Sequence, residues 1–288
     1  MPYIELKNIN KVFNPNSNRE HHALKNINLV INKGDFITII GGNGAGKSTL
    51  FNAISGVFPL DSGSISINDV EISSTKEFER AKYISRVFQN PLDNTAPRMT
   101  VAENMALALN RGERRTLKFS KNKDNIALFE NLLKNLNLGL EQKLNTEMGV
   151  LSGGQRQKVA FASVLAMDSD TLVIDEPTSQ LDPEGTAGIF EIIDTLKKQG
   201  KTIVLVEHKI DLLAQYADEV LVMQNGRMIA QGRTEDVLAD FTLLERGVML
   251  PQTVFFNHEL ECQGLSLDNV PVTRGACIQQ LRNKINGE

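Results

Sequence analysis

A nine-residue stretch, GGNGAGKST at residues 41–49, restricts the possible folds of this chain more than any other feature. It directly follows the apolar run FITII (36–40) and opens a segment with helical spacing from Gly46 to about Gly56. Glycines let the backbone wrap around an anion, so that several N–H groups can converge on phosphate oxygens. A strand, a glycine loop and a helix in this order predict a phosphate-binding loop within an α/β domain.

The loop also contains the side chains that nucleotide chemistry requires. We expect Lys47 to reach the β- and γ-phosphates and the Ser48 hydroxyl to bind Mg²⁺. The nucleotide-binding candidates in this loop are Gly41, Gly42, Asn43, Gly44, Ala45, Gly46, Lys47, Ser48 and Thr49. The pattern therefore predicts a nucleoside triphosphate bound together with Mg²⁺.

Two adjacent carboxylates follow another apolar run, in TLVIDEP at residues 171–177. The run predicts a buried strand with Asp175 at its C-terminal end, where ligands bind in open α/β sheets. We expect Asp175 to hold Mg²⁺ and Glu176 to polarise an attacking water molecule. A salt-bridged acidic pair with a purely structural role is the alternative.

Two further polar residues stand just after predicted strands. Gln89 follows YISRVF (83–88), and His208 follows TIVLVE (202–207). Either residue alone is more often structural than catalytic. At this edge of a sheet, however, the imidazole of His208 could contact a γ-phosphate.

A second glycine motif, LSGGQ at residues 151–155, precedes apolar residues at helical spacing. We expect a loop at 151–154 and a helix from Gln155 onward, with Ser152, Gly153 and Gly154 at the helix start. Free N–H groups and the helix dipole favour an anion there. The chain therefore contains two candidate anion-binding loops.

Strand-sized apolar runs alternate with helical patterns along most of the chain, which favours an α/β domain with a mainly parallel sheet. Residues 3–13 and 23–34 are predicted to be antiparallel strands outside this alternation, and 219–232 a hairpin with Asn-Gly at its turn. From residue 236 onward, short helical patterns mix with prolines and glycines. We interpret residues 236–288 as a small C-terminal appendage.

Composition argues against several other classes of protein. The net charge of −4 does not suggest a nucleic-acid binder, which is usually basic. The two cysteines form no CxxC motif, which fits a reducing cytosol. The N-terminus has no export signal, and no apolar run approaches the ~20 residues of a membrane span. We expect a soluble protein that reaches a membrane only through a partner.

Two polar segments carry weaker predictions. Residues 111–124, RGERRTLKFSKNKD, are basic, and we interpret them as a solvated loop, with contact to an anionic lipid or partner as the alternative. His21 and His22 are placed in a polar loop, and no further ligands at suitable spacing suggest a metal site there.

The order of these motifs resembles that of the ATP-binding subunit of ABC transporters, over about residues 3–235. On this resemblance, 41–49 looks like the Walker A loop, 151–155 the family signature, 173–176 the Walker B strand and 179–182 the D-loop. The resemblance implies a P-loop NTPase cassette with a mainly parallel core sheet, an antiparallel β subdomain and a helical signature subdomain at about 90–168. The implied domains are a cassette at 1–235 and the appendage at 236–288.

The resemblance also implies functional roles. Catalytic roles are implied for Lys47, Gln89, Glu176 and His208. A Mg²⁺ shell is implied for Ser48, Gln89 and Asp175. Phe13 lies where the family places an aromatic ring that stacks on adenine, although an ordinary core phenylalanine is the alternative. ATP and Mg²⁺ are therefore the expected substrate and cofactor.

In this family two cassettes pack head to tail, and the signature of one covers the γ-phosphate of ATP on the Walker A loop of the other. Ser152, Gly153, Gly154 and Gln155 would then act in trans, which explains why one chain has two anion-binding loops. The implied partners are a second ATPase subunit and integral membrane transport subunits, at the cytoplasmic face of a prokaryotic membrane.

The class of transporter is predicted from longer stretches. VFQNP, DEPTSQLDPEGT and the tail GLSLDNVPVT resemble the ATPases of energy-coupling factor importers, which take up vitamins or transition-metal ions. Residues 94–115 look more like ATPases of importers that use an extracellular binding protein. Soluble ABC ATPases are a third possibility, but this chain has neither their long heptad insertion nor two cassettes. The cargo and the choice between homodimer and heterodimer stay open.

Overall fold

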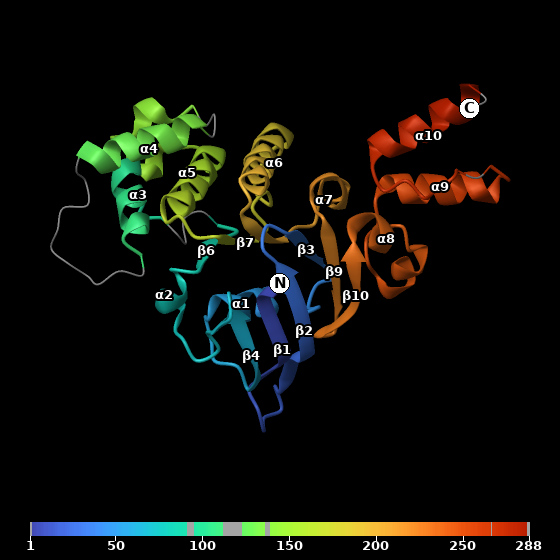
Figure 1. The fold of residues 1–288 in the computed structure, drawn as a ribbon, viewed down its shortest axis with the longest axis horizontal. Coiled ribbons are helices and arrows are strands. Elements are labelled where there is room, and N and C mark those ends of the chain that lie inside the picture. Colours follow the sequence, from blue (N-terminus) through green and yellow to red (C-terminus); the bar gives the residue numbers. More distant parts are fainter. Residues whose placement is uncertain (1, 91–94, 112–122, 136–138, 266, 287–288) are drawn as a thin grey trace.

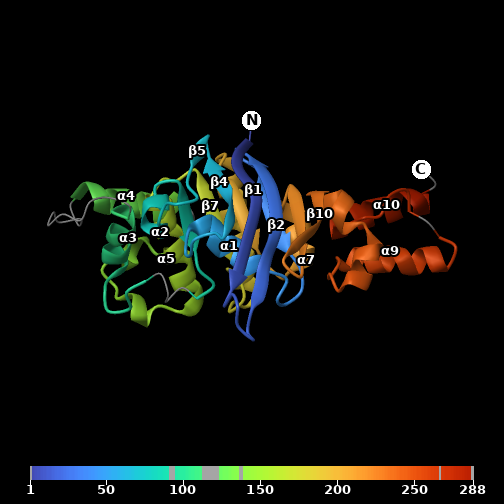
Figure 2. The same cartoon turned by 90° about the horizontal axis from the view of Figure 1, so that it is seen from below.

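The computed structural model describes residues 2–90, 95–111, 123–135, 139–265 and 267–286. Two sheets occupy the middle of the molecule, between two groups of helices (Figures 1 and 2). At one end lie α3 (Val101–Leu109), α4 (Lys123–Asn135) and α5 (Gly153–Ala166). At the other end lie α9 (Gln252–Cys262) and α10 (Arg274–Asn286). The predicted α/β class with a separate helical layer is confirmed.

The core sheet has the strand order β10-β9-β3-β8-β7-β6. The strands from β9 to β6 are parallel, and β10 runs antiparallel to β9 in the predicted hairpin. Their bounds are β3 (Phe36–Ile40), β6 (Ile84–Val87), β7 (Thr171–Asp175), β8 (Thr202–Val206), β9 (Glu219–Gln224) and β10 (Arg227–Arg233). The predicted mainly parallel sheet is therefore correct.

Both faces of this sheet are covered, which explains why β3 and β8 are apolar without alternation. Successive residues of β3 point to opposite faces. Phe36 and Ile40 belong to the core that includes α5 and α6 (Pro183–Lys198), whereas Ile37 and Ile39 belong to the core on the other face. That second core includes α1 (Lys47–Ser55) and the antiparallel sheet.

The antiparallel sheet has the order β2-β1-β4-β5. Its strands are β1 (Pro2–Phe13), β2 (His21–Asn32), β4 (Ser62–Ile67) and β5 (Val70–Glu71). The placement of His21 and His22 in a loop is wrong, because they open β2 and pair with Phe13 and Val12 of β1. Both histidines are exposed at this end of the ladder, where a polar side chain fits a strand as well as a loop.

Local sequence explains where several helices begin. Thr100 caps α3 and shares a capping box with Glu103, whose side chain accepts the Thr100 N–H at 2.8 Å. Asp182 caps α6 by accepting the Gly185 N–H at 2.7 Å, and Pro183 occupies the first turn. The basic segment predicted as a loop lies mostly outside the described residues.

Short elements complete the fold. They are α2 (Glu77–Arg80), α7 (Ile210–Tyr216), α8 (Thr234–Leu238) and the 3₁₀ turns η2 (Glu141–Lys143), η3 (Met148–Val150) and η4 (Phe241–Arg246). The predicted boundary near residue 235 falls within α8, and the division into two domains stays a prediction. Within the described ranges, no helix is both long enough and apolar enough to cross a bilayer.

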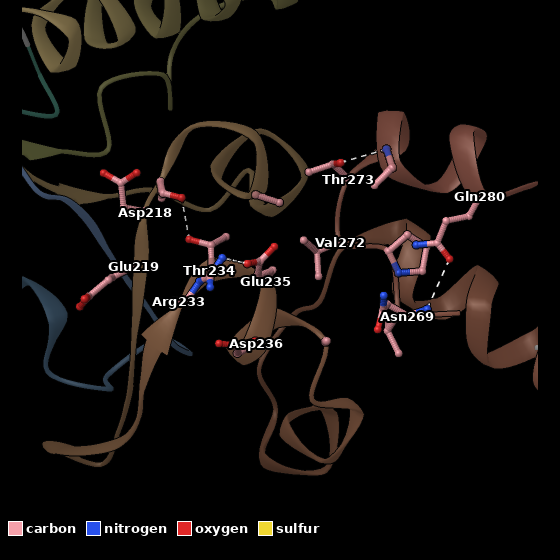
Figure 3. Close-up of a pocket in the computed structure, with 16 residues that line it drawn as sticks. Asp218, Glu219, Arg233, Thr234, Glu235, Asp236, Asn269, Val272, Thr273 and Gln280 are labelled. Carbon is pink, nitrogen blue, oxygen red and sulfur yellow. Dashed lines mark hydrogen bonds and ion pairs between the residues drawn. The ribbon is translucent and has the colours of Figure 1, made fainter. Parts of the chain in front are cut away.

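A hollow of about 1010 Å³ lies between residues 214–239 and residues 269–280. Figure 3 shows its walls, which include Asp218 just before β9, Glu219 of β9, Glu235 of α8, Asn269 before α10 and Gln280 of α10. None of the predicted site residues lines it. The chemistry predicted from the sequence therefore has to be sought at the edge of the core sheet.

Candidate nucleotide-binding and catalytic site

The parallel strands bring the predicted site residues to one edge of the core sheet. Val206 of β8 is in register with Ile39 of β3 on one side and with Asp175 of β7 on the other. The segments that follow these strands contain the glycine loop, Glu176 and His208. This is the edge at which open parallel sheets bind ligands.

The glycine loop needs glycine at Gly46 for a specific reason. This residue has a φ of 103°, and a Cβ added to it would lie 2.7 Å from the carbonyl oxygen of Ala23. The added atom would press against backbone, which cannot move aside as a side chain could. The loop is therefore held against β2 in a conformation that L-residues rarely adopt.

Lys47 begins α1 and is almost fully buried, with 7% of its surface exposed. Its ammonium donates to the carbonyl oxygens of Gly41 at 2.8 Å and Gly42 at 3.2 Å. Burial lowers the pKa of Lys47, and the charges of Glu176 and Asp175 oppose that shift. The loop thus holds a cation above its own backbone, where an anionic ligand could replace the carbonyls.

Glu176 has a backbone φ of 39°, in the left-handed region that only a few per cent of non-glycine residues adopt. Its N–H donates to the carbonyl of Val206 at 2.8 Å, which fixes the turn against β8. Strain of this kind is found where the surrounding structure imposes it, often at functional sites. At this turn the two neighbouring carboxylates have different partners: Glu176 contacts Gln89 and His208, whereas Asp175 contacts Arg86.

The carboxylate of Glu176 is held on both oxygens. The Nε2 of Gln89 donates to Oε2 at 2.7 Å, and the Nε2 of His208 lies 2.8 Å from Oε1. These three residues come from segments after three different strands. The structure thus joins three of the predicted catalytic residues into one hydrogen-bonded chain.

Asp175 has a different environment. Its carboxylate lies 3.6 Å from the guanidinium of Arg86 on β6, and both side chains are mostly buried. Burial raises the pKa of Asp175, although Arg86 lowers it in part. Burial also lowers the pKa of Arg86. Both shifts favour the neutral forms, so the pair only partly compensates the burial of its charges. The sequence reasoning missed Arg86, because an arginine within a short strand carries no motif.

The donors near this edge suit a hard divalent cation. Ser48 is exposed at the start of α1 and offers a hydroxyl, and Asp175 offers a carboxylate. Gln89 donates its amide NH₂ to Glu176, so its carbonyl oxygen faces elsewhere and can accept. Oxygen ligands of this kind, few in number and supplemented by water and phosphate, are typical of Mg²⁺.

The second glycine motif begins α5. Ser152 caps the helix and accepts the Gln155 N–H at 3.3 Å, and the Gln155 side chain accepts the Ser152 N–H at 3.2 Å. The helix itself starts at Gly153, two residues earlier than predicted. No hydrogen bond among the described residues joins 152–155 to the glycine loop at 41–49. The two anion-binding candidates thus remain separate within one chain.

Phe13 lies at the end of β1 and is only partly buried. Its ring meets that of Phe58 edge-to-face at 5.4 Å, and the ammonium of Lys11 lies 5.6 Å from its centre. One face of an aromatic pair at the surface is compatible with stacking on a base. The role in adenine binding stays a prediction.

A smaller cavity of about 270 Å³ adjoins the glycine loop. It is lined by the loop residues 41–43, by Glu207 and His208, and by 247–249 near the C-terminal helices. Neither Glu207 nor residues 247–249 carry a motif that would predict their place beside the glycine loop.

Comparison with known proteins agrees with this geometry. The family model described as "ABC transporter" matches residues 24–179. The chain belongs to the ABC transporter family of ATP-binding proteins. It is an ABC ATPase, as predicted, and its cassette is similar to a nucleotide-free ATP-binding cassette from an ABC transporter (TM-score 0.74, 30% identity, 85% of this chain and 98% of that one).

Other relatives of this cassette differ in their names. A Clostridioides difficile "Tyrosine transport ATP-binding protein" is 36% identical over 78% of this chain and 90% of its own length. The "Energy-coupling factor transporter ATP-binding protein EcfA2" of Lactobacillus gasseri is 32% identical over 99% of this chain and 98% of its own. A dimeric cassette in a post-hydrolysis state, bound to ADP and Pi, has 29% identity and a TM-score of 0.70, with 80% of this chain and 98% of that one covered.

Proposed function

We propose that this ABC ATPase energises a membrane importer of the energy-coupling factor type. The proposal is supported by the resemblance of its longer motifs and by a relative of that name that extends over nearly the whole chain, C-terminal helices included. In this role the protein is peripheral at the cytoplasmic face of a prokaryotic membrane, and vitamins or transition-metal ions are the class of cargo.

For the hydrolysis itself, we assign the water-polarising role to Glu176. The observation that carries this assignment is the hydrogen-bonded chain from Gln89 through Glu176 to His208. A carboxylate held on both oxygens is oriented before the reaction, which is what a general base requires. His208 has half of its side chain exposed, so it can also contact the γ-phosphate.

The glycine loop, residues 41–49, binds the phosphates in this proposal. Lys47 already lies over the loop, and its ammonium exchanges the carbonyls of Gly41 and Gly42 for phosphate oxygens. Ser48, Gln89 and Asp175 would hold Mg²⁺, which neutralises charge on the β- and γ-phosphates when bound. Phe13 supplies a ring for the adenine.

The signature residues Ser152, Gly153, Gly154 and Gln155 serve a second cassette. Ser152 and the first N–H groups of α5 form an anion site that the chain's own glycine loop does not reach. Dimerisation would bring this site onto ATP held by the partner. Hydrolysis is then coupled to closure of the dimer, and closure performs the transport work.

A surface between the core and the helical layer fits a membrane partner. Phe78 of α2 and Leu107 of α3 are 59% and 57% exposed. Arg111, just beyond α3, pairs with Glu77 of α2 at 3.1 Å, which joins the two elements at this place. Exposed apolar side chains beside an ion pair form a surface that an amphipathic segment can cover.

The test is capture of the tagged protein from its native membranes in mild detergent, with mass spectrometry of the bound proteins. A shared membrane protein together with small, very apolar binding proteins is the expected result. Phe78→Asp should reduce this capture about tenfold or more. Ile285→Asp is the matched control, because Ile285 is 82% exposed but lies in α10, at the opposite end of the molecule.

A binding-protein-dependent importer is the second candidate. It is favoured by the resemblance of residues 94–115 and by the relative with a tyrosine-transport name. Capture of a conventional pair of permease subunits would select it. Capture of no membrane protein by wild type would instead favour a soluble ABC ATPase and overturn both transport proposals.

A further inference from the structure

A buried carboxylate lies directly behind the pair formed by Glu176 and His208. Glu207 is 2% exposed, and no lysine, arginine or histidine forms an ion pair with it among the described residues. It accepts three hydrogen bonds instead. The Thr178 hydroxyl donates at 2.7 Å and the Thr178 N–H at 3.3 Å to one oxygen, and the His208 N–H donates at 2.9 Å to the other.

These contacts join the two segments that contain the proposed catalytic groups. Thr178 lies two residues after Glu176, and Glu207 is adjacent to His208 in the chain. Lys209 forms a second link, since its ammonium donates to the Thr178 carbonyl at 3.3 Å and to the Thr186 hydroxyl at 2.5 Å. The segment after β7 is therefore fixed to the segment after β8 on both sides of His208.

This arrangement matters because the His208 side chain is not fixed by core packing, whereas Glu176 is mostly buried, with 19% of its side chain exposed. His208 has 51% of its side chain exposed, so its position depends on its backbone. Glu176 has a strained backbone that the surroundings must maintain. The 2.8 Å contact between them is thus set by how the two segments are joined.

We infer that Glu207 and Thr178 are positioning residues for hydrolysis, acting through His208 and Glu176. This inference rests on the proposed function. A buried carboxylate without a cation is costly unless hydrogen bonds satisfy it, and a purely structural role could use an apolar residue here. The carboxylate suits this place because its two oxygens can each accept from a different segment.

The first test compares Thr178→Val with Thr178→Ser. Valine keeps the shape but removes the hydroxyl donor, whereas serine keeps the donor. We expect Thr178→Val to lower kcat about tenfold, with the affinity for a fluorescent ATP analogue unchanged within about twofold. Thr178→Ser should restore most of kcat. Equal losses in both variants, or a loss of affinity in place of kcat, would overturn the inference.

The second test is a double-mutant cycle with Glu207→Gln and His208→Ala. Glutamine places an NH₂ donor opposite an N–H, which breaks one of the two links. We expect Glu207→Gln to lower kcat in wild type but to change it less than about twofold in the His208→Ala background. Fully additive losses would overturn the positioning role and leave the proposed function intact. A fully active His208→Ala variant would instead contradict the proposed role of His208.

Discussion

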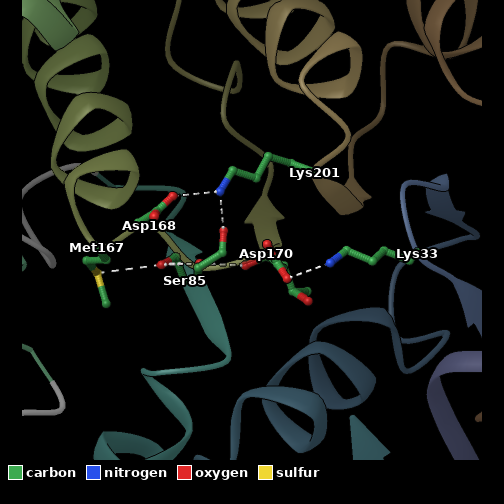
Figure 4. A network of polar contacts seen from close by, with 8 residues as sticks. Lys33, Ser85, Met167, Asp168, Asp170 and Lys201 are labelled. Carbon is green, nitrogen blue, oxygen red and sulfur yellow. Dashed lines mark hydrogen bonds and ion pairs between the residues drawn. The ribbon is translucent and has the colours of Figure 1, made fainter. Parts of the chain in front are cut away.

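Acidic residues at the two ends of the same parallel strands have different kinds of partner. At the amino ends, Asp168 and Asp170 lie just before β7 and each has its own lysine, Lys201 at 3.1 Å and Lys33 at 2.9 Å. Figure 4 shows these pairs beside Ser85. The hydrogen bond from Lys33 lowers the pKa of Asp170, which means that the fold favours its charge.

At the carboxyl ends, Asp175 and Glu176 lack such balance. Asp175 has Arg86 at 3.6 Å, and its pKa is raised. Glu176 is held by an amide and an imidazole. At the amino ends, lysines neutralise the acidic side chains. At the carboxyl ends, Asp175 and Glu176 leave negative charge near the glycine loop, which suits phosphate. The comparison teaches that the acids at the amino ends are paired with lysines, as suits a structural role, whereas the acids that we propose to act on the ligand lie at the carboxyl ends without lysine partners in the part of the chain that the structure describes.

Glu176→Gln should have the largest effect of the variants that test this contrast. The amide keeps the size of the side chain but cannot take a proton from water. We expect kcat for ATP hydrolysis to fall about 10³-fold, with ATP affinity retained. Phosphate release and binding of a fluorescent ATP analogue measure the two quantities. Glu191→Gln, on the exposed face of α6, is the control and should change neither.

Full activity in Glu176→Gln would remove Glu176 from its proposed role. The hydrogen-bonded chain at the carboxyl ends would then be structural, like the ion pairs at the amino ends, and the contrast between the two ends would disappear.

Asp175→Asn should have an intermediate effect, raising thermal stability but weakening the binding of nucleotide with Mg²⁺. Because the folded-state pKa of Asp175 is raised, the ionised form opposes folding above its ordinary pKa. The neutral amide should therefore raise the melting temperature, by about 2 °C. The same change should increase the Mg²⁺ concentration needed for half-maximal nucleotide binding about tenfold.

Thermal unfolding and a Mg²⁺ titration of nucleotide binding check the two effects separately. A lower melting temperature would show that Arg86 compensates Asp175 more fully than the pKa shifts indicate. In that case the carboxyl ends would be balanced in charge, as the amino ends are.

The fold could be predicted from the sequence because its strongest signals are local. The runs FITII and TIVLV, the glycine loop and the cap at Asp182 each determine their own short segment, and all agree on parallel strands joined by helices. The place of the site, at the carboxyl ends of the parallel strands, could be predicted in the same way, because the motifs directly follow strands. Glu176 and His208 come just after strands, so both were expected at this edge, but their direct contact depends on the pairing of β7 with β8.

The rest of the site depends on contacts between segments far apart in sequence. Arg86 meets Asp175 only because β6 pairs with β7. Glu207 looks like an ordinary residue at a strand end, and its bonds to Thr178 arise from the packing of two loops. His21 and His22 were misplaced for a related reason, since pairing with β1 extends a strand into polar sequence.

Asp170→Asn, at the amino ends, should have the smallest effect. The Asp170 side chain is 47% exposed, and solvent screens its pair with Lys33, so the free energy of unfolding should fall by less than about 1 kcal/mol at pH 7. Since the folded-state pKa is lowered, this stabilisation is present above the ordinary value of about 3.9 and is lost as pH falls through the folded-state pKa.

Thermal unfolding of wild type and Asp170→Asn across pH measures this difference, which should shrink toward zero below about pH 4. About 1 M salt at pH 7 should shrink this difference as well, because the Debye length falls to ~3 Å and salt then screens the exposed charges from each other. Lys33→Met provides the matched control, since Asp170→Asn should add little in that background. A loss above about 3 kcal/mol, or any change in kcat, would mean that the amino ends do more than balance charge, and the contrast with Asp175 and Glu176 would fail from this side.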